Sequence, residues 1–134
     1  MRRRARARAL QAVYAWDLNE RESIAAATSR VWDDLALGAE EREFATPLIR
    51  TLEARGREID EALGGVTTNW RLERLGAIER AVLRLAGAEL LRSETPARVV
   101  IQEAVLLAER YGSEESARFV NGIVDALARK LGRI

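Results

Sequence analysis

The chain has 134 residues, with 22 basic and 21 acidic side chains and a formal net charge of +1. It contains neither cysteine nor histidine, which excludes disulfides, thiolate metal sites, the usual zinc ligands and the commonest general base. No apolar run approaches the roughly 18 residues that a membrane-spanning helix requires. We therefore expect one soluble, cytoplasmic domain over residues 1–134, with no metal, no cofactor and no membrane contact.

Alanine, leucine, arginine and glutamate dominate the composition, and only two prolines are present, so helix is favoured throughout. Apolar residues recur at helical spacing along most of the chain. The pattern predicts an all-α bundle of about seven helices joined by short connections. Six of these helices are expected over 3–19, 23–34, 40–63, 77–92, 96–111 and 113–131, and a short one from a Thr68 cap through Trp70 to Leu72.

Glycine and proline set further expectations for two of these helices. Gly64-Gly65 is expected to stop the long third helix, and Pro47 to bend it or to set its start. Asn121 and Gly122 lie inside the last helix, although neither residue is favoured there. Gly122 is expected to permit close packing against another helix.

Arginine makes up five of the first eight residues, at positions 2, 3, 4, 6 and 8, and the first acidic residue is Asp17. Alanines at 5, 7 and 9 continue the helical spacing, so these arginines are expected on an ordered helix. Positive charge there opposes the helix dipole, whereas guanidinium groups suit phosphate oxygens. The cluster therefore predicts a nucleic-acid partner, although a frayed, solvated terminus also fits.

The i, i+4 spacing divides the arginines into two rows. Arg2 and Arg6 share one helix face, and Arg4 and Arg8 share another. A membrane fits these rows less well than nucleic acid, because no strong apolar stripe with an aromatic anchor accompanies them.

Four segments, in order, resemble the NusB family of small helical antitermination factors of bacteria. The arginine cluster is followed by ALQAVYAW at 9–16, and ERL at 73–75 by IERAVLRLA at 78–86. Pro96 then precedes VIQEA at 100–104, and Tyr111-Gly112 precedes FVNGIVD at 119–125. Together the segments span nearly the whole chain.

The resemblance implies a NusB-like fold and a role that is not enzymatic. Such proteins pair with the ribosomal protein NusE and bind the boxA element of nascent, single-stranded ribosomal RNA transcripts. They promote assembly of an antitermination complex on RNA polymerase. By resemblance, RNA contacts fall on Arg2, Arg3, Arg4, Arg6, Glu115 and Phe119, and contacts with the partner protein on Tyr14 and Glu79.

Three of these positions also fit purely structural roles. Tyr14 and Phe119 stand at core spacing on their helices, and Glu79 fits a position that faces solvent. Arg84 and Glu103 are expected to form an ion pair between the helices over 77–92 and 96–111.

Other classes of protein fit less well. An enzyme is not expected, because no Gly-rich phosphate loop and no His or Cys nucleophile or base is present. The alternatives are a protein-only helical adaptor and an RNA-binding domain detached from a ribosomal RNA methyltransferase. The sequence leaves open whether the chain is a monomer or a homodimer.

Overall fold

The chain forms an all-α bundle in a computed structural model that describes residues 1–67 and 71–134. This confirms the predicted fold class, with six α-helices and one 3-10 turn in the described residues. The expected short helix from Thr68 to Trp70 falls outside them, and Leu72 begins the 3-10 turn. The elements are α1 (Arg2–Asp17), α2 (Ile24–Asp34), α3 (Ala39–Val66), η1 (Leu72–Arg74), α4 (Ala77–Arg92), α5 (Ala97–Tyr111) and α6 (Glu114–Lys130).

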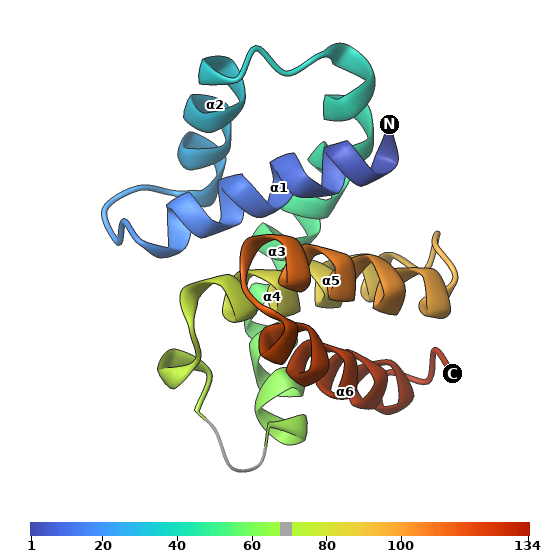
Figure 1. The fold of residues 1–134 in the computed structure, drawn as a ribbon. Helices are drawn as coiled ribbons and strands as arrows, with labels where there is room; N and C mark the ends of the chain where they lie inside the picture. The colour runs from blue at the N-terminus through green and yellow to red at the C-terminus, as the bar shows by residue number, and fades with distance from the viewer. Residues whose placement is uncertain (68–70) are drawn as a thin grey trace.

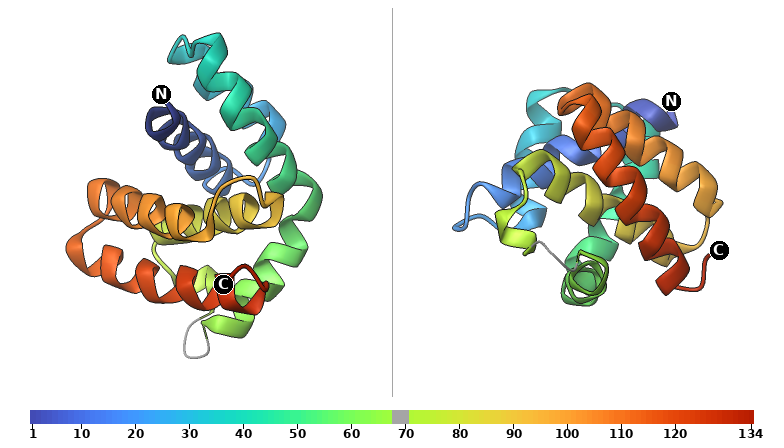
Figure 2. Two further views of the ribbon diagram at one scale, coloured as in Figure 1. Left: turned by 90° about the vertical axis from the view of Figure 1, so that its right-hand side faces the viewer. Right: turned by 60° about the horizontal axis from the view of Figure 1, so that its bottom comes forward.

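The long helix α3 connects the two halves of the molecule. It contacts α1 and α2 in one half and α4 and α6 in the other (Figure 1). The left view of Figure 2 shows α3 along one side, with α1 above α4 and α5, and α6 below them. The N-terminal end of α1 thereby lies beside the first turns of α3, where the candidate site is found.

The course of α3 differs from the expectation at two points. Its backbone leaves helical geometry at Arg55, where φ is −122° and ψ is 20°, and not at Pro47. It also continues through Gly64-Gly65 to Val66, so the expected stop is wrong. The nearest atoms to a Cβ atom at Gly65 would be those at the end of the flexible Lys130 side chain, which can move aside, so packing does not require glycine there.

Close helix packing occurs at Gly87, where the sequence had pointed to Gly122. A Cβ atom at Gly87 would lie 2.7 Å from Cγ2 of Ile59, so α4 approaches α3 too closely for a side chain. Gly122 is exposed, and a Cβ atom there would meet nothing within 4 Å. The expectation for Gly122 is therefore wrong.

Candidate functional site

The first turn of α1 presents three arginines to solvent. Arg2, Arg3 and Arg4 are exposed, and no acidic residue stands in that turn to oppose them. Arg2 and Arg4 each contact a side chain of α3, and Arg3 contacts Glu103 of α5. The Arg2 guanidinium lies 5.2 Å from the centre of the Phe44 ring, and Arg4 Nε lies 3.8 Å from Glu41. The result is a cationic turn, defined here as Arg2, Arg3 and Arg4.

Arg6 is withdrawn from solvent, which corrects the expectation of an exposed row with Arg2. Its side chain is 5% exposed and its Nε donates to Glu89 Oε1 at 2.9 Å. The guanidinium also stacks on Phe44, 4.9 Å from the ring centre. Arg2 and Arg6 do share a face, but that face turns toward α3 and α4. A buried arginine must be paired, and Arg6 joins the start of α1 to α4.

Glu103 completes this cluster from α5. It accepts hydrogen bonds from Arg3 Nε at 3.2 Å and from Arg6 NH1 at 3.4 Å. The expected pair between Arg84 and Glu103 is therefore wrong, because each residue takes different partners. Sequence spacing alone could not reveal these contacts, which join residues 97 and 100 positions apart.

A second group of predicted residues comes together where α4 and α6 begin. Glu79, Glu115 and Phe119 line one shallow pocket of about 320 Å³. Ser116 Oγ donates to Glu79 Oε1 at 3.0 Å, which links the two helices. Phe119 is half-buried and packs against the core while it lines the pocket. The ring of Phe119 thus contributes to the core and also forms part of the pocket wall.

Tyr14 is not among the residues that line this pocket. It is half-buried on α1 and packs against the hydrophobic core. Because α1 packs against α4, Tyr14 and Glu79 stand on neighbouring helices.

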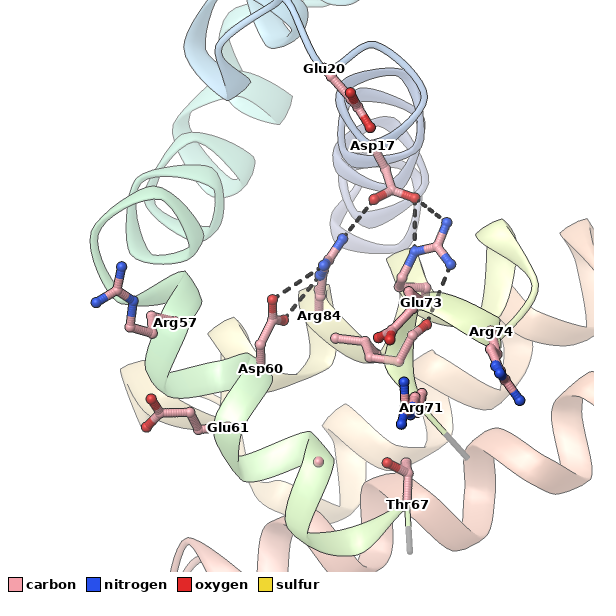
Figure 3. A pocket seen from close by; sticks show the side chains of 13 residues that line it. Asp17, Glu20, Arg57, Asp60, Glu61, Thr67, Arg71, Glu73, Arg74 and Arg84 are labelled. Atoms are coloured by element: carbon pink, nitrogen blue, oxygen red, sulfur yellow. Dashed lines mark hydrogen bonds and ion pairs between the residues drawn. The ribbon is translucent and has the colours of Figure 1, made fainter. Parts of the chain in front are cut away.

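An ion-pair network at the C-terminal end of α1 was not predicted from the sequence. Asp17 accepts hydrogen bonds from Arg80 Nε at 2.9 Å and from Arg84 NH1 at 2.8 Å. Arg84 Nε also donates to Asp60 at 3.0 Å, so it bridges α1 and α3 (Figure 3). The i, i+4 spacing of Arg80 and Arg84 was the one available signal.

The network shifts the titration of two of its members. Burial raises the pKa of Asp17, but hydrogen bonds and charge from Arg80 and Arg84 outweigh burial and hold that pKa below its ordinary value. Burial likewise lowers the pKa of Arg84, and its contacts with Asp60 and Asp17 reverse this to a raised pKa. Both residues are therefore charged at neutral pH, and the network acts as a clamp between α1, α3 and α4.

The groove beside this clamp carries mixed charge. Arg57, Arg71 and Arg74 line it together with Glu20, Glu61 and Glu73 (Figure 3). A balanced lining gives no preference for an anion. Within residues 1–67 and 71–134, no group of three or more potential ligands is placed to hold a metal ion. No helix of the same part is long and apolar enough to cross a membrane.

The chain is thus an all-α protein whose helical bundle presents an exposed cationic turn. The NusB family model matches residues 3–129, and the chain belongs to the NusB family. This confirms the resemblance drawn from the four sequence segments. Members of this family are transcription antitermination factors and not enzymes.

Named relatives and solved structures agree with this assignment. The chain is 47% identical to the transcription antitermination protein NusB of Anaeromyxobacter dehalogenans. The aligned region covers 97% of this chain and 92% of that protein. The NusB of Solibacter usitatus is 39% identical, with coverage of 97% and 90%.

Two solved structures extend the likeness to the fold. T. maritima NusB superposes with a TM-score of 0.89 at 34% identity and covers 97% of this chain and 92% of that one. A structure of the antitermination factors NusB and NusE in complex with double-stranded RNA gives a TM-score of 0.84 at 32% identity, with coverage of 97% and 98%.

Proposed function

We propose that this chain acts in transcription antitermination by binding boxA-type RNA together with a NusE-like ribosomal protein. The two proteins bind the boxA element of a nascent ribosomal RNA transcript in the cytoplasm. They then promote assembly of the antitermination complex on RNA polymerase. The solved complex of NusB and NusE with double-stranded RNA, which contains a chain 32% identical to this one, supports joint binding of RNA by two such proteins.

The cationic turn is the observation that carries the RNA role. Three exposed guanidinium groups stand on one helical turn, and guanidinium binds phosphate with two parallel hydrogen bonds. Arg6 has a different part: its buried pair with Glu89 fixes the turn to the bundle. In this proposal Arg2, Arg3 and Arg4 contact phosphates, and Arg6 supports them from below.

The pocket between α4 and α6 supports adjacent RNA and partner contacts. Glu79 is assigned to the partner protein, as is Tyr14 on α1. Glu115 and Phe119 are assigned to the border of the RNA. Because Glu79 lines the same pocket as Glu115 and Phe119, a protein bound at Glu79 would touch RNA bound beside it. Such adjacency gives a physical reason for joint binding of the two partners.

A competition experiment tests this function. Labelled boxA-type RNA is bound by the chain with and without the NusE-like protein, and unlabelled boxA or scrambled RNA is added. We expect the partner to tighten RNA binding, and boxA RNA to compete better than scrambled RNA. A protein-only adaptor would capture the partner equally well but leave the RNA unbound, which would overturn the RNA role.

A further inference from the structure

Glu103 is a nearly buried carboxylate that reaches the cationic turn from α5. Its Oε1 accepts from Arg3 Nε and its Oε2 from Arg3 NH2, both at 3.2 Å. The Glu103 side chain is 10% exposed, whereas that of Arg3 is 73% exposed. A negative charge beside a surface for RNA weakens the attraction of phosphate, so its presence there needs a physical reason.

Neutralising Arg6 does not supply that reason. Arg6 Nε already donates to both oxygens of Glu89, at 2.9 and 3.2 Å. Its contact with Glu103 is a single, longer one of 3.4 Å. The two-pronged contact of Glu103 is with Arg3, and this is the pair that the carboxylate is placed to make.

The geometry of the guanidinium group explains what this pair does. Arginine has five N–H donors spread over separate edges of a planar group. Glu103 occupies the edge formed by Nε and NH2, which leaves the edge formed by NH1 and NH2 for a second acceptor. Since Arg3 remains largely exposed, that second edge is open to a phosphate.

An Arg3 side chain that is already ordered in the free protein favours RNA binding. A long arginine side chain loses much rotamer freedom when it is fixed, and a side chain fixed before binding loses less at the moment of binding. The negative charge of Glu103 therefore reduces the attraction of phosphate, but the same residue holds the Arg3 guanidinium in an outward-facing position before RNA binds.

We propose that Glu103 is a positioning residue for RNA binding, which holds Arg3 so that its free edge faces an RNA phosphate. This inference rests on the proposed RNA role of the cationic turn. In the alternative hypothesis, Glu103 competes with phosphate for Arg3 and so inhibits RNA binding. The two hypotheses predict opposite changes in RNA affinity when the charge of Glu103 is removed: a loss if Glu103 positions Arg3, and a gain if it competes with phosphate.

The test compares Glu103→Gln with Glu109→Gln, which removes the same charge from an exposed position of α5. RNA affinity is measured with boxA-type RNA at low salt, and stability by urea unfolding. We expect Glu103→Gln to weaken binding by about three- to tenfold, because glutamine keeps one acceptor oxygen but loses the charge and the second acceptor, so Arg3 is held less firmly. Glu109→Gln should not weaken binding. Tighter or unchanged binding by Glu103→Gln would overturn the inference.

A double-mutant cycle separates positioning from a general structural effect. If Glu103 acts through Arg3, then Glu103→Gln should change the affinity little in a chain that already carries Arg3→Gln. Equal losses in both backgrounds would mean that Glu103 acts through the fold, and would overturn the inference.

Arg3→Lys gives a second test at an exposed site that the fold does not depend on. It keeps the charge but cannot offer one edge to Glu103 and another to phosphate, so binding should weaken here too. Wild-type affinity in Arg3→Lys would overturn the inference about Glu103 but not the proposed function. RNA binding that is absent from the wild-type chain, with and without its partner, would overturn the proposed function as well.

Discussion

Arg6 and Glu89 form a buried ion pair between α1 and α4, with Nε and Oε1 2.9 Å apart and both side chains 5% exposed. The pair lies under the exposed arginines of the cationic turn and beside the ring of Phe44. One arginine of the N-terminal cluster therefore belongs to the interior, while its neighbours face solvent. Arginines only a few positions apart in the sequence should respond very differently to substitution.

Replacing Arg6 should destabilise the fold. In Arg6→Gln, Glu89 is left as a buried charge without its main partner, and such a loss costs about 3–5 kcal/mol of unfolding free energy. Arg4→Gln, at an exposed position, should change it by no more than about 0.5 kcal/mol. Urea unfolding of the two variants makes the comparison. Wild-type stability in Arg6→Gln would contradict the assigned role of the pair.

Replacing the cationic turn should affect RNA and not stability. The triple variant Arg2→Gln, Arg3→Gln and Arg4→Gln removes three exposed charges. RNA affinity should fall, and the slope of log affinity against log salt should flatten by about 2, since single-stranded RNA gives a slope of about 0.7 per phosphate contacted.

A control for this triple variant removes the same charge elsewhere on the surface. Glutamine at Arg21, Arg57 and Arg71, all exposed, should leave the salt slope close to that of the wild type. Equal flattening by both triple variants would show that net charge alone governs binding.

Acid should weaken the clamp at the end of α1. Because the folded chain holds the pKa of Asp17 below its ordinary value of 3.8, the ionised carboxylate stabilises the fold above that value. This stabilisation is lost as pH falls through the lower, folded pKa. Asp17→Asn should be less stable than the wild type at pH 7, and the difference should shrink in acid. A difference that does not change with pH would contradict the role of Asp17.

Substitution at the pocket between α4 and α6 should separate the two partners. Glu79→Lys reverses a charge and removes the acceptor of the Ser116 hydrogen bond. It should weaken capture of the NusE-like protein by about tenfold, with little change in RNA binding by the chain alone. Glu73→Lys, at an exposed position on η1, makes the same charge reversal as a control. Equal capture by Glu79→Lys and Glu73→Lys would argue against a contact at Glu79.

Helical spacing was sufficient to predict most of the fold. Ala77–Arg92 begins and ends as expected, and Ser113 caps α6 by accepting a hydrogen bond from the backbone of Ser116. The bend at Arg55 and the close approach at Gly87 were not predictable, because they depend on how helices distant in sequence cross one another. Spacing identifies the residues that share a face but not what that face packs against.

The same limit explains the mixed outcome at the site. Periodicity placed Arg2 and Arg6 on one face correctly, but the acids that draw Arg6 inside come from α4 and α5. The network around Asp17 was hidden for the same reason, since Arg80 and Arg84 lie 63 and 67 positions away. The roles of Tyr14, Glu79, Glu115 and Phe119 toward RNA and partner stay predictions.

The mass in solution of the chain mixed with a NusE-like protein and boxA-type RNA tests the central claim most directly. Light scattering at low salt, with each component alone and with all three together, also decides between a monomer and a homodimer. We expect one complex that contains both proteins and the RNA, and that releases the RNA as salt is raised. If the two proteins remain free of RNA even at low salt, the proposed role of the cationic turn is contradicted.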